Sequence, residues 1–227
     1  MENVKKHFEE ESKEFDDIIW KIIPYYDEML EALISAISFP KSIPIKVIDL
    51  GCGTGTISSM VLKCYPNAQV TCLDIAENMV KMAKLKLSAY SNVRFITGDI
   101  THFNFDDNYD VAISSLALHH LLTDKDKKEF YKKIYTHLNQ NGIFYNADVV
   151  LASSENLQKL YIEQWKGFMA RKISREDIEN KYLAKYYEED NPAKLLDQLT
   201  WLSEIGFVDV DVIWKYYNLA VYGGVKI

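Results

Sequence analysis

The sequence predicts a doubly wound α/β fold, in which a mostly parallel sheet is covered by helices on both faces. Three observations support this prediction. Short apolar runs alternate with helical periodicity through the middle of the chain, a glycine-rich turn follows the first apolar run, and two more apolar runs close the chain. Strands separated by helical crossovers run parallel, and their helices cover both faces of the sheet.

The length and composition fit one globular domain. The chain has 227 residues, of which 48% are hydrophobic and 26% are charged, so it can form one substantial core. We expect a single domain with four parts, which are an N-terminal helical lid at 1–44, an α/β core at 45–150, a helical insertion at 151–205 and a C-terminal hairpin at 206–227.

The N-terminal part has helical periodicity that proline interrupts. From Glu9 to Ser38 apolar residues recur at steps of three and four, and Pro24 divides this stretch into two helices in series. The segment at 39–44 contains two prolines and is expected to be a loop.

The core alternates between strand and helix patterns. Strands are expected at Lys46–Leu50, Ala68–Asp74, Asn92–Thr97, Asp110–Ser114 and Gly142–Asp148. Helices are expected between them at Thr54–Cys64, Glu77–Tyr90 and Asp124–Leu138.

The alternation stops after residue 150. Helices rich in aromatic residues are expected at Ser153–Lys172, Ser174–Glu188 and Pro192–Ile205. The runs Phe207–Trp214 and Leu219–Lys226 are close enough to form an antiparallel hairpin at the sheet edge. This hairpin brings the expected number of strands to seven.

A glycine-rich turn directly follows the first expected strand. Asp49, Gly51, Gly53 and Gly55 stand at alternate positions and lead into a helix. Such glycines let the backbone turn sharply and leave main-chain amides open to a ligand at the N-terminus of the helix. The second strand ends in Asp74, and 74 − 55 gives 19 positions after Gly55, close to the roughly 20-residue offset of a ribose-binding acid. These residues predict a site for a nucleotide cofactor in the core at 45–150.

A third edge of this site follows the third strand. Ligands of doubly wound folds lie outside the carboxyl ends of the strands. Asp99 stands at this place and is expected to accept a hydrogen bond from the exocyclic amine of an adenine ring. The apolar residues expected to pack against the ring are Ile75, Met79 and Ile100.

With its motifs in this order, the chain resembles class I S-adenosylmethionine-dependent methyltransferases over about Val47–Val149. The resemblance implies a Rossmann-like fold, S-adenosylmethionine as the cofactor, and transfer of a methyl group to a small-molecule acceptor. It implies that Asp49 and Gly51 hold the methionine end of the cofactor. Ser115 and Leu116 would line the site beside the sulfonium.

The flanking segments resemble a narrower branch that contains trans-aconitate methyltransferase-like and carboxy-S-adenosylmethionine synthase-like proteins. This resemblance rests on Phe15-Asp16 and Ile23-Pro24-Tyr25-Tyr26 near the N-terminus, and on Gly206-Phe207, Trp214, Tyr217 and Lys226 near the C-terminus. A carboxylated cofactor needs cationic partners, and the insertion offers only Arg171 and Arg175 as arginines. Methyl transfer is therefore the first prediction and cofactor carboxylation is the alternative.

Two adjacent histidines follow the fourth strand, where an acceptor is expected to bind. A hydroxyl or ammonium acceptor must lose a proton, and an imidazole is a suitable base near neutral pH. His119 and His120 are therefore candidate catalytic bases, with packing beneath the following loop as the alternative. The aromatic candidates for the acceptor pocket, each with core packing as its alternative, are Tyr25, Tyr26, Tyr161, Trp165 and Trp214.

Charge and cysteine content argue against several other classes of protein. The net charge is −7 and basic residues form no cluster, so the chain is not expected to bind nucleic acid. No stretch approaches the roughly 20 apolar residues that cross a bilayer. The three cysteines form neither a disulfide framework nor a metal-binding pattern, so no metal is expected. We expect a cytoplasmic monomer or homodimer.

Two other functions share parts of this pattern. A nicotinamide-dependent dehydrogenase places its third glycine three positions after its second, whereas here Gly55 comes two positions after Gly53. A non-catalytic module that binds S-adenosylmethionine stays open as an alternative, because cofactor binding alone does not require turnover.

Overall fold

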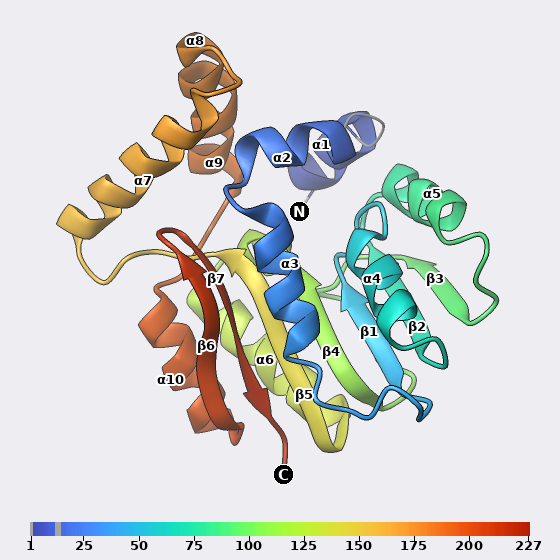
Figure 1. The fold of residues 1–227 in the computed structure, drawn as a ribbon. Helices are drawn as coiled ribbons and strands as arrows, with labels where there is room; N and C mark the ends of the chain where they lie inside the picture. The colour runs from blue at the N-terminus through green and yellow to red at the C-terminus, as the bar shows by residue number, and fades with distance from the viewer. Residues whose placement is uncertain (1, 12–14) are drawn as a thin grey trace.

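A computed structural model describes residues 2–11 and 15–227 of the chain. Within these residues a seven-stranded sheet has the order β3-β2-β1-β4-β5-β7-β6, with helices on both faces (Figure 1). The first five strands pair in parallel, and β7 lies antiparallel between β5 and β6. The predicted doubly wound fold with its C-terminal hairpin is confirmed.

The strands lie close to their expected positions. Their bounds are β1 Lys46–Leu50, β2 Gln69–Asp74, β3 Val93–Thr97, β4 Tyr109–Ser115, β5 Leu138–Val149, β6 Val208–Tyr216 and β7 Leu219–Val225. The largest difference is in β5, which begins before Gly142 because Leu138 already pairs with Tyr109 across an irregularity in the register.

Burial explains why the central and edge strands have different sequences. Val47, Ile48 and Leu50 of β1 are fully buried between β2 and β4. A parallel strand that is covered on both faces needs apolar residues at successive positions. The edge strand β6 instead alternates between exposed and partly buried residues, as a strand with one solvated face does.

Helices cover both faces of the sheet (Figure 1). One layer consists of α3 (Tyr26–Ser35), α4 (Thr56–Cys64) and α5 (Glu77–Lys86), and the other of α6 (Asp124–His137) and α10 (Leu195–Ile205). Each layer encloses its own apolar core against the sheet. Among the described residues every helix is too short or too polar to cross a bilayer.

A third group of helices covers the carboxyl ends of the strands (Figure 1). It consists of α1 (Glu2–Glu11), α2 (Phe15–Ile22), α7 (Glu155–Met169), α8 (Arg175–Asp177), a π-helical turn (Ile178–Leu183) and α9 (Ala184–Glu189). The indole N–H of Trp165 in α7 donates to the carbonyl of Ile22 in α2 at 2.6 Å. This bond joins α2 of the N-terminal segment to α7 of the helical insertion, and we term the helices of this third group together the lid.

The expectation of two N-terminal helices is wrong, because α1 forms a third helix ahead of α2. Most residues of α1 are charged, so its apolar periodicity is too weak to detect. The carboxylate of Glu9 in α1 accepts the main-chain N–H groups of Glu77 and Asn78 at 2.5 and 2.9 Å, at the start of α5. The predicted break at Pro24 is confirmed, since it falls between α2 and α3.

Candidate active site

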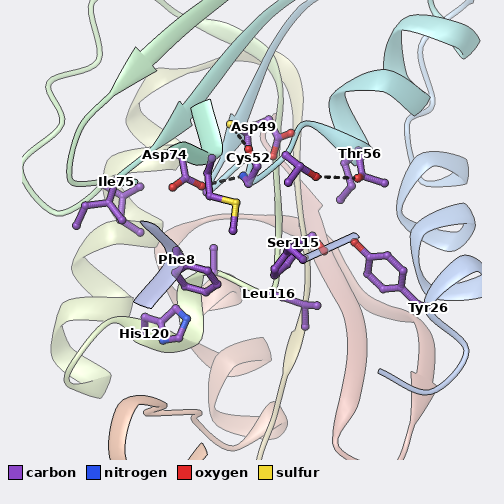
Figure 2. A pocket seen from close by; sticks show the side chains of 18 residues that line it. Phe8, Tyr26, Asp49, Cys52, Thr56, Asp74, Ile75, Ser115, Leu116 and His120 are labelled. Carbon is purple, nitrogen blue, oxygen red and sulfur yellow. Dashed lines mark hydrogen bonds between the residues drawn. The ribbon is translucent and has the colours of Figure 1, made fainter. Parts of the chain in front are cut away.

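A cavity opens at the carboxyl ends of β1, β2 and β4, beneath the N-terminal helices (Figure 2). Its lining combines residues of the N-terminal helices, the glycine-rich loop and the ends of β2 and β4. We term it the cofactor pocket. The predicted cofactor residues that line it are Asp49, Gly51, Gly53, Asp74, Ile75, Met79, Ile100, Ser115 and Leu116.

The glycine-rich loop turns β1 into α4 through left-handed backbone conformations. Gly51, Gly53 and Gly55 have φ angles of 78°, 52° and 82°. A Cβ atom at Gly51 would lie 2.3 Å from the Cβ of Ala117, so only glycine fits there. Gly55 does not line the pocket but stands at the N-cap of α4, against Ala83 of α5. The glycines thus bring main-chain amides to the pocket wall.

Asp74 ends β2 at the pocket wall and is 7% exposed. Its Oδ2 accepts the main-chain N–H of Gly53 at 2.8 Å, and its Oδ1 accepts that of Ala76 at 2.9 Å. Burial raises the pKa of this carboxyl, and these two donors oppose the rise. A carboxylate has about four acceptor positions, so Asp74 can also accept hydrogen bonds from the two hydroxyls of a ribose.

The side chain of Asp49 is almost completely buried at the wall of the cofactor pocket, beneath the glycine-rich loop. It is 1% exposed, and the hydroxyl of Ser58 donates to its Oδ2 at 2.6 Å. Burial raises the pKa of Asp49 to about 7, the Ser58 hydrogen bond opposes this rise, and the Asp74 carboxylate adds to it. A cation bound nearby would favour the ionised form of Asp49. S-adenosylmethionine carries two such cations, its ammonium and its sulfonium.

The predicted adenine site is only partly assembled at the pocket. Ile75, Met79 and Ile100 line the wall beyond Asp74. Asp99 is not among the lining residues, and its Oδ1 accepts the main-chain N–H and the hydroxyl of Thr101 at 2.8 and 2.7 Å. The role of Asp99 toward adenine stays a prediction.

A second cavity adjoins the cofactor pocket beneath the lid. We term it the lid cavity. The side chains that line both cavities are Phe8, Phe15, Leu116 and His120. Leu116 has a φ angle of 52°, which is unusual for a bulky residue and marks a sharp turn directly after β4. The remaining walls of the lid cavity are mostly apolar or aromatic, and they include Ile18, Ile19, Ile22, Ile23, Val149, Trp165, Tyr182 and Tyr186.

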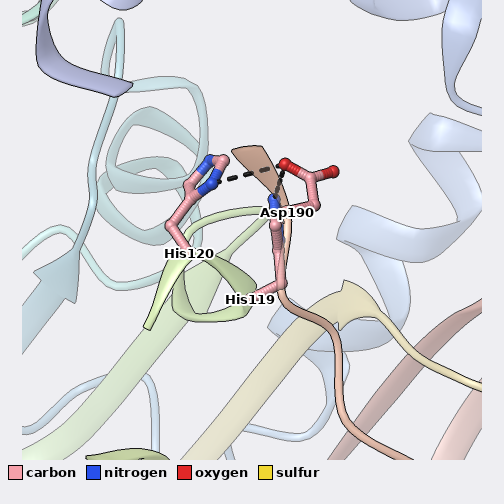
Figure 3. A group of neighbouring side chains, drawn as sticks. All are labelled: His119, His120 and Asp190. Atoms are coloured by element: carbon pink, nitrogen blue, oxygen red, sulfur yellow. Dashed lines mark ion pairs between the residues drawn. The ribbon is translucent and has the colours of Figure 1, made fainter. Parts of the chain in front are cut away.

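One end of the lid cavity is polar (Figure 3). His119 and His120 lie in a 3₁₀ turn after β4, and Asp190 follows α9. The Nε2 atom of His119 and the Nδ1 atom of His120 each lie 3.4 Å from Oδ1 of Asp190. On its other side, Nδ1 of His119 lies 2.5 Å from Oδ1 of Asp148, at the end of β5. The two predicted histidines are therefore adjacent and buried, with carboxylates around them.

The two imidazoles have opposite pKa shifts. Burial lowers the pKa of His119, but the carboxylates of Asp148 and Asp190 outweigh burial and raise it to about 10. Burial and the neighbouring His119 lower the pKa of His120 to about 3. A general base works best with a pKa near the operating pH, and neither value is near 7. Proton transfer by either histidine stays a prediction.

The five aromatic acceptor candidates separate into two groups. Tyr26 lines the cofactor pocket and Trp165 lines the lid cavity. The structure does not bring the other three to either cavity. Tyr25 is 43% exposed against Tyr216, Tyr161 accepts a hydrogen bond from Lys215 at 2.9 Å, and Trp214 packs at the edge of the apolar core.

Several site residues escaped the sequence analysis because distant segments bring them together. They are Phe8, Asp148, Lys185 and Asp190. Asp148 had a detectable signal, since it stands at the carboxyl end of a predicted strand like Asp74. Asp190 had none, because it follows a lid helix that no motif relates to the histidines.

Comparison with known proteins agrees with this geometry. Residues 47–142 match the family described as a methyltransferase domain. The chain is 32% identical to the carboxy-S-adenosyl-L-methionine synthase of Campylobacter fetus subsp. fetus, over 96% of this chain and 94% of that relative. It is 28% identical to the enzyme of the same name from Helicobacter pylori, over 97% and 95%. The structure of human N-acetylserotonin methyltransferase with S-adenosylmethionine matches with a TM-score of 0.64 at 18% identity, covering 98% of this chain and 56% of that one.

The fold and the cofactor pocket define an enzyme of the class I S-adenosylmethionine-dependent methyltransferase type, which confirms the predicted class and cofactor. Within this class, the chain belongs to the family that contains the carboxy-S-adenosyl-L-methionine synthases.

Proposed function

We propose that this enzyme transfers the methyl group of S-adenosylmethionine to a small acceptor bound in the lid cavity. The observation that carries this proposal is the wall that the two cavities share. Leu116 lines both of them, and the resemblance assigns this residue to the surroundings of the sulfonium. An acceptor in the lid cavity therefore lies next to the methyl group, where positioning and exclusion of water favour the transfer. A hydroxyl or ammonium acceptor must in addition lose a proton to a base or to solvent.

The lid cavity fits an acceptor that is mostly apolar and has one polar end. Isoleucines of α2 and aromatic rings of α7 and α9 supply the apolar walls. His119, Asp190 and Lys185 stand together at the polar end. Burial lowers the pKa of Lys185 to about 8, so its ammonium stays largely charged at neutral pH. A hydroxyl, carboxyl or amine of the acceptor suits this end.

Full-length similarity to carboxy-S-adenosyl-L-methionine synthases favours a second candidate, which is carboxylation of the cofactor's methyl group. A carboxylated cofactor places an anion beside the sulfonium, and a buried anion needs a cationic partner. Among the described residues, the lining of the cofactor pocket includes no lysine or arginine. Lys185 lines the adjoining lid cavity, so the carboxylate would have to reach it past the wall that the two cavities share. Methyl transfer therefore ranks first.

The two reactions leave different products. The purified enzyme is incubated with methyl-labelled S-adenosylmethionine and a small-molecule cell extract, and the mixture is examined by mass spectrometry. Methyl transfer yields S-adenosylhomocysteine and a labelled acceptor, whereas carboxylation leaves the label on a heavier cofactor. A carboxylated cofactor as the only new species would overturn the proposal.

A variant pair tests the place of the acceptor. Ile18→Trp fills part of the lid cavity without lining the cofactor pocket. We expect it to lower kcat/KM for the acceptor about 10-fold or more through misplacement, while S-adenosylmethionine affinity stays unchanged. Ile43→Trp, at a 41% exposed position on the loop before β1, is the control and should change neither quantity. Equal turnover in both variants would exclude the lid cavity as the acceptor site.

A further inference from the structure

We propose that His119, His120 and Asp190 bind one divalent transition-metal ion at the polar end of the lid cavity. One donor atom from each residue lies within 4.8 Å of the other two. Figure 3 shows both imidazoles turned toward the Asp190 carboxylate. His119 and His120 are buried, and Asp190 has a side chain that is only 15% exposed.

The spacing of these atoms is compatible with ligands around one metal ion as well as with ion pairs. His119 Nε2 and His120 Nδ1 each lie 3.4 Å from the same oxygen of Asp190. Nitrogen–oxygen hydrogen bonds are usually about 2.7–3.2 Å long. Two ligands that each bond a metal at about 2.1 Å are separated by about 3.0–3.4 Å in octahedral or tetrahedral geometry. The three donor atoms lie within 4.8 Å of one another, so the two imidazole rings and the carboxylate would move closer together around a bound ion.

Asp148 holds the His119 ring in the orientation that a metal site requires. Its Oδ1 lies 2.5 Å from Nδ1 of His119, which leaves Nε2 directed at Asp190. The other carboxylate oxygen accepts the main-chain N–H of His119 at 3.0 Å and the amide of Asn146 at 3.1 Å. A fixed carboxylate on the remote nitrogen of an imidazole is a recurrent support for metal ligands.

His120 provides an independent observation that points to a ligand. Its side chain is more than nine-tenths buried, and its Nδ1 atom has no hydrogen-bond partner among the described residues. A buried polar atom without a partner is costly, and a bond to a metal would satisfy it. The ring of Phe8 packs edge-on against His120, with centroids 5.7 Å apart, so the imidazole is held in place from the side of α1.

The ligand set selects the kind of metal. Two imidazoles and one carboxylate suit Zn²⁺, Fe²⁺ or Co²⁺, whereas Mg²⁺ and Ca²⁺ prefer oxygen ligands throughout. Three protein ligands leave coordination positions that face the lid cavity. An oxygen atom of the acceptor would complete the coordination there, and this last point rests on the methyl transfer proposed above. This proposal departs from the sequence-based expectation that the protein binds no metal. Only folding brings Asp190 next to the two histidines.

Metal binding is measured without turnover, so its failure is distinguishable from failure of the proposed methyl transfer. The full-length protein is freed of metal by dialysis against a chelator and titrated with ZnCl₂ in a calorimeter. Co²⁺ is added in a parallel sample and followed by its visible absorption. We expect one Zn²⁺ per chain, a ligand-field band from Co²⁺, and no heat from MgCl₂. Absence of Zn²⁺ binding would overturn the proposal.

Three variants locate the ion. Asp148→Asn keeps all three ligands and should weaken Zn²⁺ binding about 10–100-fold, as expected for loss of a supporting carboxylate. Asp190→Asn removes the anionic ligand and should weaken binding at least as much. His102→Ala removes an imidazole that is 87% exposed and should leave the affinity unchanged.

Circular dichroism establishes that each variant is folded, and His120→Ala replaces Asp190→Asn if the latter is not. Equal Zn²⁺ affinity in the wild type and in the folded ligand variant would overturn the site. Loss of binding in His102→Ala would also overturn it, because the ion would then lie at the surface.

Discussion

The cofactor pocket and the lid cavity share a wall but are built in different ways. Asp49 lies near the end of β1 and Gly53 in the turn that follows, and Asp74 ends the next strand. The lid cavity instead combines α1, α2, the end of β5 and the helices between α7 and α9. Much of the cofactor pocket thus comes from residues close in sequence, whereas the lid cavity depends on contacts between distant segments. Single substitutions should therefore affect the two cavities differently.

The largest difference between the cofactor pocket and the lid is expected from glycine substitutions. Gly51→Ala places a Cβ atom 2.3 Å from that of Ala117, at a φ angle of 78°. Backbone strain and overpacking together should lower the free energy of unfolding by about 2–5 kcal/mol. Cofactor binding should be lost, because the loop must move away from the pocket. Chemical denaturation and calorimetry with S-adenosylmethionine measure the two effects.

Gly167→Ala in the lid helix α7 is the matched control. An added Cβ atom meets nothing within 4 Å there, and the helical backbone accepts alanine. We expect this variant to raise the free energy of unfolding by up to about 1 kcal/mol. A similar loss of stability in both variants would mean that the tight approach of Gly51 to Ala117 is unimportant.

The difference between local sequence patterns and contacts between distant segments also explains how much of the molecule could be predicted from the sequence. The strand positions and the predicted cofactor contacts of Asp49, Gly51 and Asp74 follow from local patterns, and the structure brings these three residues to one pocket. The spacing of Gly55 predicts a place beside them, yet Gly55 caps α4 outside the pocket. Spacing identifies the turn but does not specify which of its glycines faces the ligand.

The lid was predicted less completely for a physical reason. Its helices are amphipathic or mostly charged, and periodicity alone does not define which face meets the site. Tyr25 and Tyr26 are adjacent, yet Tyr26 lines the cofactor pocket and Tyr25 lies outside at a φ angle of 52°. Asp148 and Asp190 meet His119 only after β5 and α9 have packed. Such contacts depend on tertiary structure, which a single sequence does not reveal.

A change of pH should have an intermediate effect, which we expect on the affinity of the cofactor pocket for S-adenosylmethionine. Burial raises the pKa of Asp49 to about 7, so the carboxyl is protonated below that pH and ionised above it. Only the ionised form attracts the cations of S-adenosylmethionine. Its affinity should therefore increase by up to about 10-fold between about pH 6 and about pH 7.5, because one proton is released on binding at the lower pH.

Asp49→Asn separates this effect from other titrations. The amide does not ionise, so cofactor affinity in this variant should be weaker and nearly independent of pH over the same range. Calorimetric titrations at several pH values, with buffers of different ionisation enthalpy, also count the protons released. An equally steep pH dependence in the variant would assign the proton to another group.

The smallest effect is expected from the contact of the lid helix α2 with the glycine-rich loop and α5. Asp16 of α2 accepts hydrogen bonds from Thr54 of the glycine-rich loop at 2.6 Å and from Lys86 of α5 at 2.7 Å. The Asp16–Lys86 pair is partly exposed, with side chains 42% and 30% exposed, so solvent screening limits its contribution to less than about 1 kcal/mol. Asp16→Ala should loosen α2 and weaken cofactor affinity by less than about five-fold. Hydrogen exchange at residues 15–22 measures the loosening directly.

Asp107→Ala is the matched control for this contact. Asp107 pairs with Lys46 at 2.6 Å and has similar exposure, but Lys46 begins β1 at the end of the strand away from the cofactor pocket. Stability should fall by a comparably small amount, while hydrogen exchange in α2 and cofactor affinity stay unchanged. If both variants weakened the cofactor equally, the effect would follow from net charge, since each removes one carboxylate. A loss specific to Asp16→Ala would instead show that the lid helix and the glycine-rich loop act as one unit when the cofactor binds.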